Sequence, residues 1–191
     1  MNTERGNYMI LFVNACVRKN SRTLILAKRL LDTLDGEIKE VRLEEIKFPV
    51  VNEDFINRRE ALKNAQKYDD PMFTLAKDFA DADLVVIAAP YYDLSFPAMI
   101  KQYFEQINVV GITFSYSESG VPIGLCRAKK LYYVTTAGGP ILSDDFGFGY
   151  VKALANSFYG IEEVCQIKAE GLDIIGANEQ EILENVNIYG C

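Results

Sequence analysis

Short apolar runs alternate with amphipathic segments along the chain. Five of the runs are expected to form strands, at residues 9–13, 38–43, 84–89, 131–135 and 164–169. The runs at 9–13, 84–89 and 131–135 are typical of strands buried on both faces, as in a parallel sheet. The run at 38–43 alternates with charged residues, which indicates a strand near an edge of that sheet.

Apolar residues at three- and four-residue spacing predict helices between these strands. One is expected over 24–34, with Asn20 or Ser21 as its N-cap and Gly36 as a left-handed residue just past its end. Further helices are predicted over 73–81, 97–107 and 148–158, and after Asn178. Pro97 suits the start of its helix, because proline is tolerated in the first turn. Asn178 has Glu181 three residues later as a capping-box partner.

Two stretches have a less regular pattern. Residues 44–70 are charge-rich and are expected to hold a loop and a short helix, with no role that the sequence reveals. Residues 109–127 predict a covering loop or an irregular hairpin with an aromatic tip. No linker and no internal repeat divides the 191 residues. We therefore expect one α/β domain over 1–191, with a flexible N-terminus at 1–7, in which helices cover both faces of a doubly wound five-stranded parallel sheet.

The composition of the chain excludes several classes of partner and of catalytic site. The net charge of -7 argues against a nucleic-acid partner, and the chain has no histidine, which removes His-based catalysis and His-ligated metals. The four cysteines, at 16, 126, 165 and 191, are too far apart for a metal or iron–sulfur motif. Four free thiols, the absence of a secretory leader and the lack of any apolar run of about 20 residues predict a cytoplasmic protein that does not enter membranes.

Ligands of doubly wound folds bind at the carboxyl ends of the strands, which directs attention to loops 14–21, 90–97 and 136–145. The first loop offers N–H groups at a helix start, the Ser21 and Thr23 hydroxyls and the Arg18 guanidinium, which together suit a phosphate. It matches neither GxGxxG nor the Walker motif, and a well-capped helix with a solvated arginine explains it equally well. Cys16 in this loop is interpreted as a buried filler, with a redox thiol as the weaker alternative.

The other two loops suit a flat ring. Tyr91, Tyr92 and Phe96 follow the most apolar strand, at a place that is normally wet, and Asp93 could accept a hydrogen bond from a ring N–H. Packing on neighbouring loops or on another subunit is the alternative. Two glycines at 138–139 allow a ligand to approach the backbone closely, although they could equally form a tight turn. A phosphate site, a ring cradle and a close approach together describe the cofactor FMN.

Several segments resemble the flavodoxin-like family of FMN-dependent NAD(P)H:quinone oxidoreductases and NADH-azoreductases. They are NSRTL at 20–24, APYYDLSFPAMIKQYF at 89–104, GITFSYSESG at 111–120, TTAGG at 135–139 and AEG at 169–171. The segments fall in the family's order, and the resemblance extends over nearly the whole chain after residue 8. The resemblance implies a homodimer with FMN in active sites near the subunit interface. It also implies that NADH or NADPH and then a quinone, azo or nitroaromatic acceptor stack on the same flavin face, a ping-pong mechanism.

The resemblance also implies roles for particular residues. Those expected to bind FMN are Arg18, Ser21, Thr23, Pro90, Tyr91, Tyr92, Asp93, Leu94, Thr136, Ala137, Gly138 and Gly139. Tyr116 is expected to close over the substrate, with Phe158 beside it, and no side chain is expected to act as a catalytic group. Asp93 replaces the family's usual amide and Ala137 a bulkier basic residue, which affects the flavin potential and the choice of acceptor. Without histidine, proton delivery is left to solvent or tyrosine.

Two other classes of function remain open at this point. A flavodoxin-type electron carrier shares the fold and the acidic character, but it needs neither the covering segment 109–127 nor the aromatic stretch 91–104. A flavin-free regulatory or interaction domain on the same scaffold is the other, because fold alone does not fix function. Steady turnover of NADH with a quinone distinguishes an enzyme from a carrier, since a carrier needs a separate reductase.

Overall fold

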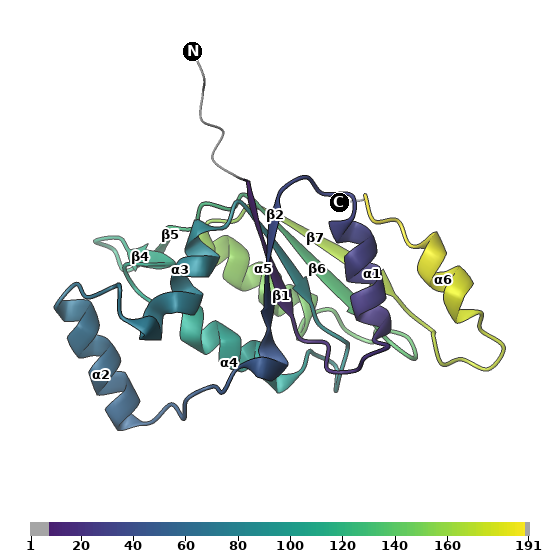
Figure 1. Ribbon diagram of the computed structural model, residues 1–191, viewed down its shortest axis with the longest axis horizontal. Coiled ribbons are helices and arrows are strands. Elements are labelled where there is room, and N and C mark those ends of the chain that lie inside the picture. The colour runs from purple at the N-terminus through teal and green to yellow at the C-terminus, as the bar shows by residue number, and fades with distance from the viewer. Residues whose placement is uncertain (1–7, 190–191) are drawn as a thin grey trace, which may run out of the picture.

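The computed structural model describes residues 8–189 and contains a parallel sheet of five strands (Figure 1). Its strands are β1 (Met9–Asn14), β2 (Glu37–Arg42), β3 (Leu84–Ala88), β6 (Lys130–Thr136) and β7 (Glu163–Ala169), in the order β2-β1-β3-β6-β7. Every pairing between neighbours is parallel. The predicted α/β class and all five predicted strands are confirmed, and β2 lies at an edge as its charged residues indicated.

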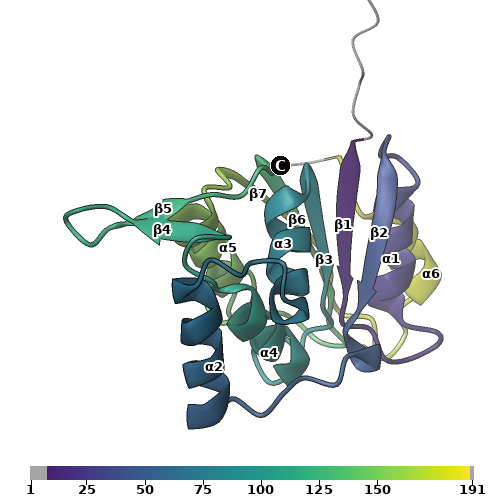
Figure 2. The same cartoon turned by 60° about the vertical axis from the view of Figure 1, so that its left-hand side comes forward.

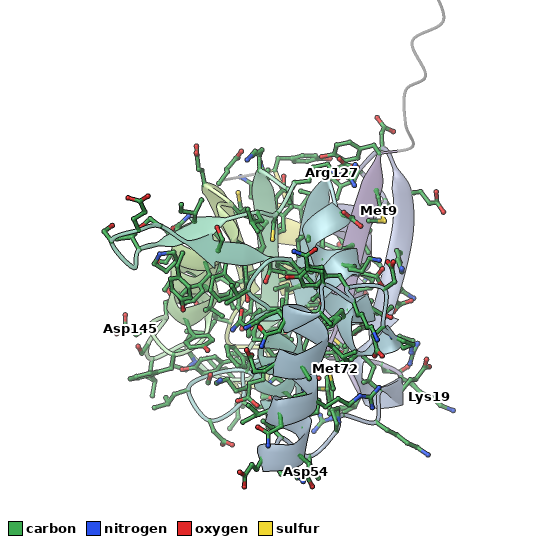
Figure 3. All side chains as sticks on the ribbon, turned by 90° about the vertical axis from the view of Figure 1, so that its left-hand side faces the viewer. Met9, Lys19, Asp54, Met72, Arg127 and Asp145 are labelled. Carbon is green, nitrogen blue, oxygen red and sulfur yellow. The ribbon has the colours of Figure 1, made fainter. Side chains whose placement is uncertain are left out.

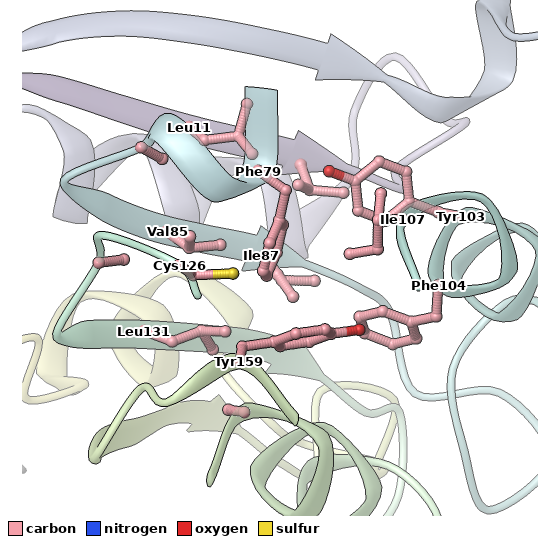
Figure 4. Close-up of a cluster of buried hydrophobic side chains, with 14 of the residues drawn as sticks. Leu11, Phe79, Val85, Ile87, Tyr103, Phe104, Ile107, Cys126, Leu131 and Tyr159 are labelled. Carbon is pink, nitrogen blue, oxygen red and sulfur yellow. The ribbon is translucent and has the colours of Figure 1, made fainter. Parts of the chain in front are cut away.

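Helices cover both faces of the sheet (Figures 1 and 2). On one face lie α1 (Arg22–Leu31) and α6 (Glu179–Asn185), and on the other α3 (Thr74–Asp81), α4 (Ala98–Ile107) and α5 (Phe148–Leu154). Because successive side chains of a strand point to opposite faces, Leu11 packs in the α3–α4 core and Phe12 in the α1 core. Figure 4 shows the first of these cores, where the Phe79 and Tyr159 rings meet edge-on at 4.7 Å.

The start of α1 agrees with the sequence, and its end does not. Ser21 is the N-cap, and its side chain accepts a hydrogen bond from the Leu24 N–H at 3.3 Å. The helix ends at Leu31 with Asp32 in the right-handed region, so the prediction of Gly36 as a left-handed cap is wrong. Gly36 instead lies against the preceding strand, where an added Cβ would be 2.7 Å from the Tyr8 carbonyl oxygen.

The charge-rich stretch forms a longer helix than expected. After the 3₁₀ turn η1 (Leu43–Glu45), α2 (Glu53–Asn64) spans 12 residues, and the 3₁₀ turn η2 (Pro71–Phe73) leads into α3. Asn52 caps α2 by accepting a hydrogen bond from the Phe55 N–H at 2.9 Å. No residue of α2 is buried, so this helix lies on the surface of the domain core rather than within it.

Residues 109–127 form an antiparallel hairpin of β4 (Phe114–Tyr116) and β5 (Pro122–Gly124). The expectation of an aromatic tip is wrong, because the turn at 117–120 reads Ser-Glu-Ser-Gly and Tyr116 lies at the end of β4. The hairpin packs on the π-helical segment η3 (Ala155–Tyr159) that continues α5. An added Cβ on Gly124 would lie 2.1 Å from the Gly160 nitrogen, so the two backbones are in direct contact.

Three remaining expectations concern termini, thiols and membranes. The predicted flexible segment 1–7 lies outside the described residues. Cys16 and Cys126 are free, but Cys165 is disulfide-bonded, so the expectation of four free thiols is wrong. Within residues 8–189, none of the helices combines the length and the apolarity needed to cross a bilayer.

Candidate functional site

A cavity of about 210 Å³ lies where the loops that follow β1, β3, β6 and β7 converge. Figure 3 labels Met9 at the start of β1 and Lys19 in the loop after it, near opposite ends of the strands. The cavity lies at the end marked by Lys19. Its lining residues are Val17, Arg18, Asn20, Ser21, Arg22, Thr23, Pro90, Tyr91, Tyr92, Thr136, Gly138 and Asp173. The three loops that the sequence singled out therefore meet, and a fourth loop joins them.

The first loop presents polar groups to this cavity. Ser21 and Thr23 are buried, and the Thr23 Oγ1 shares a hydrogen bond of 2.6 Å with the Thr136 Oγ1. That bond joins the start of α1 to the end of β6 and so fixes two walls of the cavity against each other. Within residues 8–189, the N–H groups of Arg22 and Thr23 have no acceptor, as expected in the first turn of a helix. Arg18 is exposed at the rim.

Sequence reasoning missed four lining residues: Val17, Asn20, Arg22 and Asp173. The most informative pair is Arg22 and Asp173, because the guanidinium donates to both carboxylate oxygens, at 2.6 and 3.2 Å. Glu179 accepts a further hydrogen bond from Arg22 at 3.3 Å. The Arg22 fork lowers the pKa of the Asp173 carboxyl. A search of the loop after the fifth strand would have found Asp173, since that loop also ends at this edge of the sheet.

The second loop forms one side of the cavity through Pro90, Tyr91 and Tyr92. The Tyr91 N–H donates to the Thr136 carbonyl oxygen at 3.1 Å, which continues the β3–β6 pairing into the loop. The Tyr91 hydroxyl is buried and has no hydrogen-bond partner within the described residues. A buried hydroxyl is costly without a partner, so a polar ligand atom reaching it would be stabilised.

A tight turn follows in the same loop. The N–H groups of Tyr92 and Ser95 each donate to the other residue's carbonyl oxygen, at 3.0 and 2.8 Å. Between them Asp93 and Leu94 have φ angles of 49° and 67°, the pattern of a type I′ turn. Leucine is uncommon in this left-handed region and stores strain there. Asp93 and Leu94 are exposed and are not among the residues that line the cavity, in contrast to the predicted site.

The third loop contributes backbone rather than side chains. Ala137 is buried and donates its N–H to the Ala169 carbonyl oxygen at 2.9 Å. Neither Gly138 nor Gly139 has an acceptor for its N–H group within residues 8–189. An added Cβ on Gly139 would meet nothing within 4 Å, whereas one on Gly138 would lie 2.0 Å from an oxygen of Asp173. Of the four predicted residues of this loop, Thr136 and Gly138 line the cavity and Ala137 and Gly139 do not.

The two predicted substrate residues lie together, but not at the cavity. The Phe114 ring contacts Tyr116 at 5.4 Å and Phe158 at 4.8 Å, which places all three aromatic rings where the hairpin meets η3. Neither Tyr116 nor Phe158 lines the cavity. Figure 2 shows the reason, because the hairpin extends to the side of the sheet, away from the lower edge where the strands end.

Cys16 has the properties of a structural residue. It is 4% exposed, and burial raises the pKa of its thiol to about 11. A thiol with that pKa carries almost no thiolate near neutral pH, and the thiolate is the reactive form. The interpretation of Cys16 as a buried filler therefore agrees with the structure.

Comparisons with known proteins agree with this architecture. Residues 9–189 match a protein family described by its flavodoxin-like fold. The FMN-dependent NADH:quinone oxidoreductase of Coprothermobacter proteolyticus is 33% identical over 90% of each chain, and that of Caldicellulosiruptor saccharolyticus is 32% identical over 87% of each chain. The crystal structure of an azoreductase from Bacillus anthracis superposes with a TM-score of 0.79 at 24% identity, covering 92% of this chain and 93% of that one.

Proposed function

The chain belongs to the family with the flavodoxin-like fold, and on that premise we propose that it is an FMN-dependent oxidoreductase that uses NADH to reduce a quinone, azo or nitroaromatic acceptor. The observation that carries the proposal is the cavity at four strand ends. The chain that forms it matches, over about nine-tenths of each chain, relatives named as FMN-dependent NADH:quinone oxidoreductases. We further propose a single FMN-binding domain over 1–191, acting in the cytoplasm, where its nicotinamide donor is found.

The residues present fit a flavin mononucleotide. At one end of the cavity, the first-turn N–H groups of α1 and the buried Ser21 and Thr23 hydroxyls suit a phosphate, with Arg18 at the rim. At the other end, the free N–H groups at 138–139 suit the polar edge of a ring system. Aromatic and proline side chains between them suit its flat faces.

When bound, FMN supplies the electron-transfer chemistry, and the protein supplies binding and orientation. In this assignment Arg18, Ser21 and Thr23 would hold the phosphate, and Pro90, Tyr91 and Tyr92 would lie along the ring. Thr136 and Gly138 would hold its polar edge. The chain has no histidine, so the proton that accompanies reduction of the acceptor comes from solvent or from a tyrosine hydroxyl.

We propose that the active enzyme is a homodimer in which Tyr116 and Phe158 reach the cavity of the partner subunit. Two observations support this arrangement. Tyr116 and Phe158 lie away from the cavity of their own chain, and the hairpin exposes apolar side chains at Tyr116, Val121 and Ile123. In the loops after β6 and β7, Leu142, Phe146 and Ile175 are exposed as well. Exposed apolar patches of this kind mark interaction surfaces.

The absorption spectrum of the purified protein, followed by anaerobic addition of NADH, tests the central proposal. We expect flavin bands that NADH bleaches and that a quinone restores. Flavin bands that NADH leaves unchanged would instead favour the electron carrier, which receives its electrons from a separate reductase. A protein that retains no flavin after incubation with FMN would favour the regulatory domain and would overturn the site assignment.

Two further measurements test the finer statements. Initial rates at varied NADH and quinone should give parallel double-reciprocal lines, because a ping-pong enzyme releases NAD⁺ before the acceptor binds; intersecting lines would contradict this. Sedimentation equilibrium should give twice the 21.5 kDa chain mass. A fully active species of one chain mass would overturn the shared active site.

A further inference from the structure

Asp173 places a carboxylate in the wall of a cavity that is proposed to take a phosphate. We propose that Asp173 determines the affinity of this site for phosphate-bearing ligands, because its carboxylate competes with the phosphate for Arg22. The inference rests on the proposed function, since it assigns the polar end of the cavity to the phosphate of FMN. It concerns Asp173, which neither the loop pattern nor the family resemblance singled out, and Arg22, to which the resemblance gave no role.

Arg22 and Asp173 contact each other as an arginine contacts a bound anion, with the Asp173 carboxylate in the place of the anion. Arg22 is in the first turn of α1, lines the cavity, and directs Nη1 and Nη2 to the two oxygens of Asp173 at 2.6 and 3.2 Å. A guanidinium fork binds carboxylate and phosphate in the same bidentate manner. An incoming phosphate therefore meets an arginine whose donors are directed at an internal anion.

Backbone hydrogen bonds of the loop after β7 hold the Asp173 carboxylate in this position. The Asp173 N–H donates to the Gly138 carbonyl oxygen at 2.8 Å, and the Leu172 N–H donates to the Ala137 carbonyl oxygen at 3.3 Å. Gly138 also leaves the space that the carboxylate uses, because a Cβ there would lie 2.0 Å from the Asp173 oxygen. Asp173 is thus attached to the third loop of the site, and not only to the arginine.

The charges around this end of the cavity cancel. Arg18 and Arg22 contribute two positive charges, and Asp173 and Glu179, both within hydrogen-bond distance of Arg22, contribute two negative ones. A phosphate bound here gains from hydroxyl and N–H donors and from Arg18, and little from Arg22, whose donors are directed at carboxylates. Removing the Asp173 charge leaves one positive charge uncompensated next to the phosphate, which strengthens phosphate binding.

The test measures the dissociation constants of FMN and riboflavin, by flavin fluorescence quenching, for apoprotein of the wild type and of Asp173→Asn. Riboflavin lacks the phosphate and reports on the ring end of the cavity alone. We expect Asp173→Asn to bind FMN roughly tenfold more tightly, or about 1.4 kcal/mol, with the affinity for riboflavin unchanged. The FMN affinity of the variant should also fall more steeply with added salt.

Three further variants complete the design. Arg22→Gln leaves the carboxylate uncompensated and should weaken FMN binding, and the double variant Arg22→Gln with Asp173→Asn should return close to the wild type. Glu179→Gln is the matched control, because Glu179 contacts the same arginine but does not line the cavity, and its effect on FMN should be clearly smaller. Asp173 is exposed, so its replacement should leave the thermal midpoint unchanged.

An FMN affinity for Asp173→Asn equal to or weaker than that of the wild type would overturn the inference, since the carboxylate would then be neutral or would position Arg22 on the ligand. Inorganic phosphate separates this failure from failure of the proposed function. If no protein binds flavin, but phosphate raises the melting temperature of Asp173→Asn more than that of the wild type, the competition stands and the FMN assignment fails. If neither phosphate nor FMN prefers the variant, the competition is overturned.

Discussion

The loop cluster at the carboxyl edge and the β4–β5 hairpin were both expected to serve one site, and the structure separates them. The loop cluster forms a cavity within a single chain, because parallel strands bring their following loops to one edge. The hairpin leaves the body of the domain and is anchored by the contact of Gly124 with Gly160 (Figure 2). In the loop cluster, the strand order brings the site residues together. In the hairpin, the contact between the Gly124 and Gly160 backbones sets the position of the aromatic residues.

The largest expected effect tests that packing. Gly124→Ala places a Cβ 2.1 Å from the Gly160 nitrogen and 2.2 Å from the Tyr159 carbonyl carbon, and neither backbone can move without disturbing η3. We expect the free energy of unfolding to fall by about 3 kcal/mol in urea titrations. In the cavity, Gly138→Ala has an equally short contact, but with the exposed side chain of Asp173, which can move. Equal losses for the two variants would contradict the distinction between the regions.

The next effect tests the cavity itself. Replacing Ser21 and Thr23 together by alanine removes two buried hydroxyls expected to contact a phosphate, and FMN binding should weaken by about 3 kcal/mol. Ser21 also caps α1, so part of the change concerns helix stability. Asn52→Ala is the control, because it removes the N-cap of α2, whose residues do not line the cavity. Unchanged FMN affinity in the double variant would refute the phosphate assignment.

The sequence predicts the first region better than the second for a physical reason. Buried parallel strands have apolar runs that are visible without alignment, and the positions of Ser21, Thr23 and Tyr91 follow from where those runs end. The Arg22–Asp173 pair spans 151 residues and depends on how the loop after β7 folds back, which local patterns do not encode. The sequence also shows no sign of the positive φ angles of Asp93 and Leu94. A type I′ turn usually has glycine at its second central position, and this turn has Leu94 there.

The hairpin was the least predictable element. Its aromatic residues were recognised, but the tip was assigned to them in place of Ser117 to Gly120, because residue type alone does not locate a turn. The placement of Tyr116 away from the cavity depends on the Gly124–Gly160 contact. Glycine pairs in backbone contact have no signature in a single sequence.

A smaller effect is expected at Tyr116. If the hairpin contributes to the partner's active site, Tyr116→Leu should raise the KM for a quinone by roughly threefold to tenfold, or up to about 1.4 kcal/mol, with FMN affinity unchanged. Glu118→Gln is a suitable control on the same hairpin, because Glu118 is exposed in the turn and is not one of the apolar side chains of the hairpin surface. An equal change in FMN affinity would place Tyr116 at the cofactor rather than at the substrate, and an unchanged KM would remove it from the site.

The smallest effect concerns Cys16, which is buried in the first loop. Burial raises the pKa of its thiol to about 11, and that of Cys126 to about 12, so both stay protonated in the folded protein at pH 8. Iodoacetamide at pH 8 should leave both unmodified by peptide mass mapping until guanidinium unfolds the chain. Both thiols have a higher pKa in the folded chain than in the unfolded chain, so protonation of the two thiols favours the folded state. This contribution to the free energy of unfolding is complete below about pH 8.5 and is lost as the pH rises through 11. Rapid native labelling of Cys16 would contradict its structural role.

The hydrogen bond between Thr23 and Thr136 joins positions 113 residues apart, and the other walls of the cavity come from two further strand ends. A ligand held by all of them binds the folded chain and has no site on the unfolded one. Mass action then stabilises the fold by about 2.7 kcal/mol when free ligand is a hundred times its dissociation constant. Proteases that degrade the unfolded population would therefore remove the protein faster in a vitamin-starved cell, so that its abundance follows the supply of riboflavin.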